Sequence, residues 1–202
     1  MAWVFCDEVY RGLGANAPSG AAAPESAETQ APWVADIYEK GISLGVLSKA
    51  YGLPGLRVGW LACKNTALMQ GISRYKNYLS ICGATPAEAL ALVALRHGPE
   101  LLAANRNLIQ RNLAVADAFF ARHAEVFMYN RPMAGPIGFP RMCLRGAISD
   151  FCETLAREAG VLLLPATVYG LDEPYFRIGY GRASFADNLA RLEAWMTQKG
   201  LL

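Results

Sequence analysis

Two short apolar runs on either side of a rigid loop constrain the fold of this chain more than any other feature. The runs cover residues 42–47 and 56–63. Lys49 stands at the start of the loop, Gly52-Leu-Pro-Gly55 stiffens it, and Arg57 lies at the start of the second run. Apolar runs bounded by glycine and proline predict buried β-strands. The loop is therefore predicted to hold one amine and one guanidinium between two strands.

The side chains of Lys49 and Arg57 suit an aldehyde that carries a phosphate group. Apolar flanks that partly desolvate a lysine favour its neutral amine, which is the nucleophile that forms an imine with an aldehyde. The planar guanidinium of an arginine binds a phosphate through two hydrogen bonds. Each residue also has an ordinary alternative, because Lys49 could be a solvated surface charge and Arg57 could pair with a carboxylate.

Strands and helices alternate along the whole sequence, which predicts an α/β fold. Residues 1–100 are predicted to form part of a three-layer α/β/α domain with a mostly parallel sheet. Residues 101–202 are predicted to hold a long linking helix, over about 100–125, and a smaller α+β domain. Glycine and proline mark residues 11–32 as a long loop of the kind that often covers a site.

Several residues are predicted to begin or end helices. Asn65 or Thr66 suits the N-cap of one helix, and Thr85 suits that of the next, with Glu88 completing a capping box. Ser149 or Asp150 is predicted to cap a third helix. Gly160 is predicted to end it.

Three further residues have side chains that suit an anionic or aromatic ligand. Asp7 and Tyr10 follow the apolar run at 3–6, and ligands of open parallel sheets bind beyond the carboxyl ends of the strands. Asp7 could equally be an ordinary turn residue. Arg177 interrupts the apolar segment at 175–180, where an arginine needs an anionic partner. That partner is either a protein carboxylate, in a buried salt bridge, or the carboxylate of a substrate.

Taken in order, these motifs resemble those of the class I/II aminotransferases, enzymes of fold type I that use pyridoxal 5′-phosphate. The resemblance rests on Asp7-Glu-Val-Tyr10, on Ser48-Lys49 with Gly-Leu-Pro-Gly-Leu-Arg57, and on Phe176-Arg177-Ile-Gly. It spans most of the chain, from Val4 to Trp195.

The resemblance implies a role for each of these residues. Lys49 would be the catalytic lysine that binds the cofactor and moves protons. Asp7 would pair with the pyridine nitrogen and Tyr10 with the phenolic oxygen of the ring. Ser48 and Arg57 would hold the phosphate, and Arg177 would bind the α-carboxylate of the substrate.

The resemblance also implies a reaction and partners. An amino acid and a 2-oxo acid would exchange an amino group, in amino-acid metabolism, and the intact enzyme would be a homodimer. The same constellation also serves pyridoxal-phosphate-dependent lyases and cyclases.

The sequence departs from the family in two places. Val46 stands where the family often has a hydroxyl residue that reaches the phosphate. The family has a long N-terminal half before its Asp-x-x-Tyr strand, so this sequence is expected to be the C-terminal portion of such an enzyme. A non-catalytic fragment or a ligand-sensing relic of the same fold is the alternative.

Composition argues against several other classes of protein. The net charge of +2 and the lack of a Lys/Arg-rich run give no sign of nucleic-acid binding. No apolar stretch reaches the roughly 18 residues of a membrane span, and the N-terminus does not resemble a signal peptide. The five cysteines are scattered, which predicts reduced thiols in a cytoplasmic protein. The two histidines lack partners at metal-ligand spacing, so no metal site is predicted.

Overall fold

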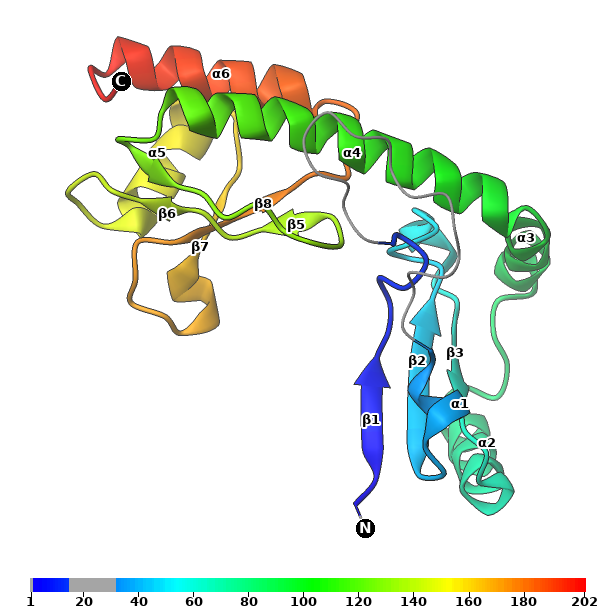
Figure 1. Ribbon diagram of the computed structural model, residues 1–202. Helices are drawn as coiled ribbons and strands as arrows, with labels where there is room; N and C mark the ends of the chain where they lie inside the picture. The colour runs from blue at the N-terminus through cyan, green and yellow to red at the C-terminus, as the bar shows by residue number, and fades with distance from the viewer. Residues whose placement is uncertain (1, 15–31) are drawn as a thin grey trace. The chain divides into compact units, whose positions relative to one another are not determined.

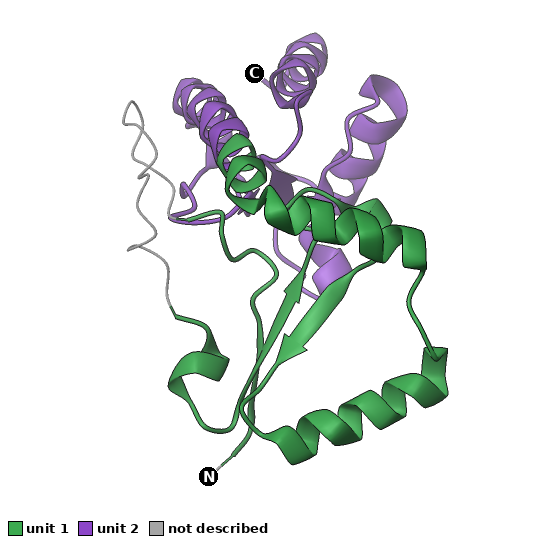
Figure 2. Ribbon diagram, turned by 90° about the vertical axis from the view of Figure 1, so that its right-hand side faces the viewer, with its two compact units in different colours: residues 1–14, 25–105 green, residues 15–24, 106–202 purple. Residues whose placement is uncertain are grey.

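The computed structural model describes residues 2–14 and 32–202 (Figure 1). The chain divides into two compact units, of which the first contains the described residues up to Asn105 and the second those from Arg106 onward (Figure 2). The division into domains after residue 100 stays a prediction. Most of the predicted loop at 11–32 lies outside the described residues.

A three-stranded sheet forms the centre of unit 1. Its strands are β1 (Val4–Asp7), β2 (Gly41–Val46) and β3 (Gly59–Ala62), in the order β1-β2-β3. β1 runs parallel to β2, whereas β3 runs antiparallel to it. The antiparallel pair follows from the connection, because residues 47–58 form a tight loop with the 3-10 turn η2 (Pro54–Leu56) and no crossover helix.

Small residues on β2 allow its neighbours to approach closely. Ser43 is fully buried, and its hydroxyl accepts a hydrogen bond of 3.1 Å from the amide of Ala35 in the short helix α1 (Val34–Ile37). Gly45 pairs with Trp60 across the β2–β3 ladder. The indole of Trp60 occupies the space that a β-carbon at Gly45 would need.

Two helices follow the sheet, α2 (Thr66–Ser80) and α3 (Thr85–Arg96). Asn65 caps α2 as predicted, because its side-chain oxygen accepts a hydrogen bond of 2.8 Å from the amide of Leu68. The prediction that Thr85 caps α3 is wrong. Ala84 occupies the N-cap position without a side-chain bond, so the helix begins one residue early and the capping box with Glu88 does not form.

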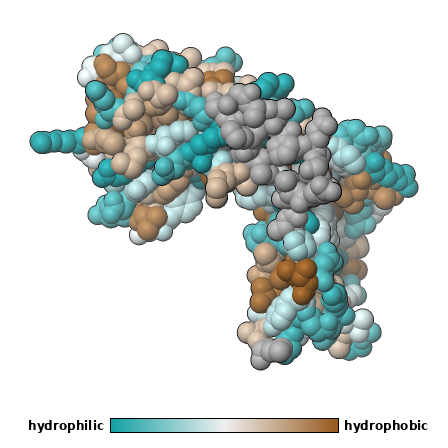
Figure 3. Space-filling view, in the orientation of Figure 1, coloured by the Kyte–Doolittle hydropathy of each residue, from teal (hydrophilic) through white to brown (hydrophobic). Residues whose placement is uncertain are grey.

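Unit 1 exposes many apolar side chains. Trp3, Val4 and Phe5 of the β1 region are 46%, 42% and 57% exposed, and Figure 3 shows hydrophobic residues gathered over this strand. α2 contributes no buried residue. Exposed apolar patches of this kind mark contact surfaces in proteins generally.

The described residues of unit 2 form short antiparallel strands and three helices. β4 (Phe127–Met128) pairs with β6 (Arg141–Met142), and a second sheet has the order β5-β8-β7, with β5 at Ile137–Gly138, β8 at Phe176–Gly179 and β7 at Leu164–Pro165. The helices are α4 (Gly98–Arg122), in which the unit boundary falls, α5 (Ile148–Ala159) and α6 (Phe185–Gln198), with the 3-10 turn η3 at Ala166–Tyr169. Figure 1 shows α6 beside the C-terminal part of α4.

The core of unit 2 lies between these helices and strands. Phe119 of α4 contacts the ring of Phe127, which in turn meets Phe176 edge to face at 5.9 Å. Phe151 of α5 packs edge to face against Trp195 of α6 at 5.6 Å. All five of these side chains are buried, so aromatic packing joins the helices to the sheets.

The structure confirms one predicted boundary of α5 and corrects the other. Gly160 ends the helix in the left-handed conformation, with φ of 66°. The caps predicted at Ser149 or Asp150 are wrong, since Ala147 is the N-cap residue. Among the described residues, no helix combines the length and the apolar character that crossing a membrane requires.

The close approach of Trp60 to Gly45 gives a testable prediction about stability. Gly45→Ala forces the new methyl group against the indole, so we expect it to lower the free energy of unfolding by about 1–3 kcal/mol. Gly55→Ala is the matched control, because nothing lies within 4 Å of the place that a β-carbon at Gly55 would take, and the change should be near neutral. Urea unfolding of both variants measures the difference. Equal stability of the two variants would contradict the packing described for Gly45.

Candidate active site

The topology of the first sheet brings five of the predicted site residues to one edge. Asp7 is the last residue of β1, and Tyr10 follows three residues later. Ser48 and Lys49 follow the end of β2, which runs parallel to β1. Arg57 precedes the antiparallel strand β3. The carboxyl ends of β1 and β2 and the amino end of β3 therefore share this edge of the sheet, which we call the site edge.

Backbone hydrogen bonds join the loops at the site edge. The amide of Ala50 donates to the carbonyl of Val9 at 3.3 Å, which ties the Lys49 loop to the turn that carries Tyr10. The amide of Leu47 donates to the carbonyl of Val58 at 3.1 Å, which ties the same loop to the residue after Arg57. These bonds link residues next to Tyr10, Lys49 and Arg57.

The turn after β1 is held by local bonds. One side-chain oxygen of Asp7 accepts a hydrogen bond of 3.2 Å from the amide of Val9. Glu8 reaches further, because its Oε1 accepts a bond of 3.2 Å from the amide of Val34 at the start of α1. The Asp7 side chain is exposed, which leaves its carboxylate accessible at the site edge.

The Lys49 loop is anchored from α4. The side-chain amide of Asn105 donates to the carbonyl of Ala50 at 2.9 Å. Lys49 itself is exposed and Ser48 is half-buried. The partial desolvation predicted for Lys49 from its apolar flanks is therefore not seen. Leu47 and Ala50, the apolar side chains on either side, are buried beneath the loop and leave the amine in solvent.

Arg57 adopts an uncommon backbone conformation for its residue type. Its φ of 56° and ψ of 36° lie in the left-handed region, which costs about 1–2 kcal/mol for a residue other than glycine. Its guanidinium donates a hydrogen bond of 3.0 Å to the carbonyl of Pro54 and is exposed. The strand predicted from residue 56 begins only at Gly59, because the η2 turn and Arg57 interrupt the extended chain. Strained conformations of this kind cluster at functional sites.

Arg177 lies in the other unit, in β8 between the buried residues Phe176 and Ile178. The strand alternation puts its half-buried side chain on the opposite face from theirs. Its guanidinium donates to the hydroxyl of Tyr169 at 3.2 Å. The ring of Tyr169 meets Phe139 edge to face at 6.1 Å.

Sequence reasoning missed Glu8, Asn105 and Tyr169. Glu8 stands inside the Asp7-x-x-Tyr10 motif, so its position was visible although its bond to Val34 was not. Asn105 lies 55 residues from its acceptor, within a run of ordinary helix formers. Neither Asn105 nor Tyr169 has a local pattern that indicates its contact.

The residues at the site edge match the chemical groups of pyridoxal 5′-phosphate. A hydroxyl and a guanidinium suit its phosphate, and a carboxylate suits a protonated ring nitrogen. A phenol suits the ring oxygen, and an accessible amine suits the aldehyde. The donor set thus fits the cofactor that the sequence motifs predicted.

Comparison with known proteins gives the family. The family model of aminotransferase class I and II matches residues 1–191. Capreomycidine synthase of Streptomyces vinaceus is 32% identical over 142 residues, which cover 70% of this chain and 36% of that protein. The aromatic amino acid aminotransferase of Rhodococcus opacus is 33% identical over 142 residues, again 70% of this chain and 36% of that protein.

Solved structures show the same likeness. A PLP-dependent aminotransferase from Streptococcus suis matches with a TM-score of 0.82 and 31% identity, over 98% of this chain and 49% of that chain. The PLP-dependent cyclase OrfR matches with a TM-score of 0.78 and 26% identity, over 96% of this chain and 50% of that chain. The chain thus spans about half the length of these structures and 36% of the two curated relatives. The chain belongs to the aminotransferase class I and II family.

Proposed function

We propose that this protein acts in a pyridoxal 5′-phosphate-dependent aminotransferase, which moves an amino group from an amino acid to a 2-oxo acid. The observation that carries the proposal is the site edge, where the topology gathers Asp7, Tyr10, Ser48, Lys49 and Arg57. The working enzyme is proposed to be a cytoplasmic homodimer with a role in amino-acid biosynthesis. Family membership supports this function, and the chain spans about half the length of the solved structures that it matches.

Each residue of the site edge has a proposed task in holding the cofactor. Ser48 and Arg57 bind the phosphate. The left-handed backbone conformation of Arg57 sets the direction in which its side chain leaves the backbone. Asp7 pairs with the ring nitrogen and keeps it protonated, while Tyr10 donates a hydrogen bond to the ring oxygen. When bound, the cofactor supplies an electron sink for the charge left by the broken bond at the substrate α-carbon.

Lys49 and Arg177 are proposed to act on the substrate. The Nζ atom of Lys49 would take the proton from the α-carbon of the amino acid and pass it to the carbon of the cofactor that carries the aldehyde, so that the amino group stays on the cofactor and a 2-oxo acid can leave. Its amine must be neutral for this, so cover from solvent in the working enzyme would favour the reaction. Arg177 binds the α-carboxylate, and Tyr169 orients the guanidinium through the bond of 3.2 Å.

A cyclase or lyase that uses the same cofactor is the second candidate. The similarity to capreomycidine synthase, with 32% identity, and the match to the cyclase OrfR favour it. The same residues hold the cofactor in both candidates. The orientation that Arg177 imposes on the substrate decides which bond is placed for cleavage.

Covalent trapping tests the assignment of Lys49. The chain is incubated with pyridoxal 5′-phosphate and reduced with borohydride, and peptide mass spectrometry then locates the attached pyridoxyl group. We expect the group on Lys49 and its loss from that peptide in Lys49→Ala. Lys64→Ala is the matched control, because Lys64 is an exposed lysine of the same unit that donates to the carbonyl of Asp36. Labelling concentrated on any other lysine would refute the proposal.

Removal of the Arg177 charge tests its assignment to the carboxylate. In the active enzyme, Arg177→Ala should lower kcat/KM for amino acids by roughly ten- to a hundredfold, since a hydrogen bond to a charged group is lost. Cofactor attachment to Lys49 should stay unchanged. Arg157→Ala serves as control, because Arg157 pairs only with Glu153 on the exposed face of α5 among the described residues. Loss of cofactor attachment in Arg177→Ala would contradict the assignment.

A further inference from the structure

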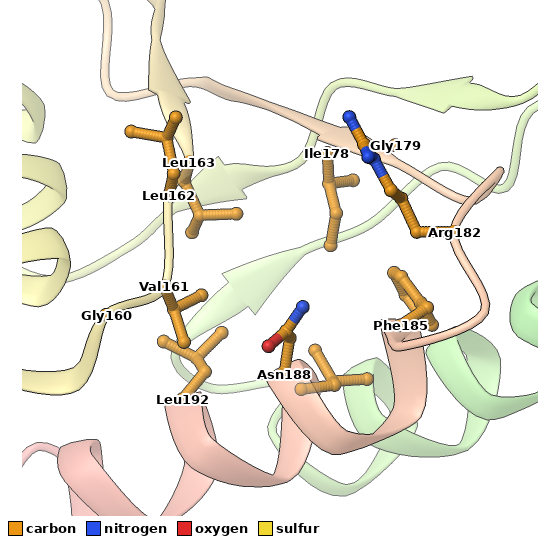
Figure 4. A pocket seen from close by; sticks show the side chains of 11 residues that line it. Gly160, Val161, Leu162, Leu163, Ile178, Gly179, Arg182, Phe185, Asn188 and Leu192 are labelled. Atoms are coloured by element: carbon orange, nitrogen blue, oxygen red, sulfur yellow. The ribbon is translucent and has the colours of Figure 1, made fainter.

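A cavity of about 370 Å³ lies in unit 2, between α6, the end of β8 and the segment that follows α5 (Figure 4). Its volume is at the small end of the range for ligand pockets, about 300–1,000 Å³. Apolar side chains form most of its wall: Val161, Leu162, Leu163, Ile178, Phe185, Leu189 and Leu192. The polar side chains of the wall belong to Arg182 and Asn188. We call this cavity the α6 pocket.

The local fold holds the walls of the α6 pocket in place. Gly160 turns the chain out of α5, and residues 161–163 then lead into β7, with Val161 and Leu163 buried and Leu162 78% exposed. On the other side, the side-chain amide of Asn112 donates to the carbonyls of Tyr180 and Arg182 at 2.7 and 2.8 Å. Because Asn112 is buried, these two bonds fix the turn that carries Arg182.

The charge around the α6 pocket is positive. Within the described part of the chain, the guanidinium of Arg182 has no hydrogen-bond or ion-pair partner, and no aspartate or glutamate lines the pocket. The guanidinium of Arg191 adds a second positive charge near the wall, 3.2 Å from the position of a β-carbon at Gly160. Asp187 lies in the first turn of α6 but is exposed and outside the lining.

The two polar side chains of the pocket come from different elements, Arg182 from the turn after β8 and Asn188 from α6. Figure 4 shows the side chain of Arg182 extending from the turn after β8 and the amide of Asn188 pointing from α6 toward Ile178. The Asn188 amide nitrogen makes one long bond, of 3.3 Å, to the hydroxyl of Ser184. Asn188 lines the cavity, and the other side chains of the wall are apolar apart from Arg182.

We propose that the α6 pocket binds a small monocarboxylate with a compact, branched aliphatic chain. The carboxylate would pair with Arg182, since an unpaired guanidinium binds such a group through two charge-assisted hydrogen bonds. The aliphatic chain would lie among Val161, Ile178 and Leu192, where it leaves water. This site uses none of the residues assigned above to the cofactor or the substrate, so it stands or falls independently of the proposed reaction.

Direct binding to the 202-residue chain tests the proposal, with 4-methylpentanoate as the probe. Calorimetric titration should show saturable binding with one site per chain. The uncharged 4-methylpentanamide has nearly the same shape, so weaker binding of the amide measures the contribution of the carboxylate. Arg182→Gln should weaken the binding of the acid by about tenfold or more, because it removes a charged partner.

Arg145→Gln is the matched control, since Arg145 is an exposed arginine of the same unit that does not line the pocket. We expect its affinity for the acid to equal that of the unaltered chain. A second variant, Ile178→Phe, fills the cavity and should abolish binding, and circular dichroism verifies that each variant is folded. Absence of saturable binding up to about 10 mM overturns the proposal. Equal binding of acid and amide, or equal effects of Arg182→Gln and Arg145→Gln, overturns the role of Arg182.

Discussion

The parallel pairing of β1 with β2 is the constraint on which the candidate site depends. Asp7 lies opposite Leu44 in this pair, and the loop with Lys49 begins only three residues later. If the two strands ran antiparallel, the residues after β1 and those after β2 would lie at opposite edges of the sheet. The bond from the Ala50 amide to the Val9 carbonyl extends the pairing beyond the strands. It ties the Tyr10 turn to the Lys49 loop.

Close packing of β3 on β2 and the strained backbone of Arg57 also contribute to the geometry of the site edge. Because Gly45 has no side chain, the indole of Trp60 fits over it and β3 can pair with β2. This pairing brings the Arg57 turn to the end of the sheet. The left-handed conformation of Arg57 is tolerated because the chain on both sides is fixed. Its guanidinium bonds to Pro54, and the next carbonyl, that of Val58, accepts from Leu47. The hydrogen bonds at Pro54 and Val58 thus hold Arg57 in its strained conformation, while its charged guanidinium stays exposed.

Features that depend on neighbouring residues could be predicted from the sequence, and those that depend on distant contacts could not. The strands around Lys49, the Asn65 cap and the helix end at Gly160 follow from local patterns, and the structure contains all three. The cap predicted at Thr85 was wrong by one residue, because α3 already begins at Thr85 and Ala84 occupies the N-cap position.

The same contrast between local patterns and distant contacts holds for the candidate active site. The order of Asp7, Tyr10, Ser48, Lys49, Arg57 and Arg177 along the chain was enough to predict the family. The bond from Asn105 to Ala50 and the bond from Arg177 to Tyr169 each depend on tertiary structure, so no pattern in the sequence indicated them. Of the two surroundings considered for Lys49, the structure has the solvated one, because the apolar residues beside it are buried beneath the loop instead of covering the amine.

The most direct test of the site edge is to map where pyridoxal 5′-phosphate binds on the isotopically labelled chain by NMR. We predict that the largest changes in amide chemical shift fall together on the turn after β1, on the Lys49 loop and on the residues around Arg57. Hydrogen bonds between these loops should transmit the change to Val9, Ala50 and Val58. Changes scattered over surface lysines such as Lys199, with the site edge unaffected, would contradict the assignment of the cofactor to this edge.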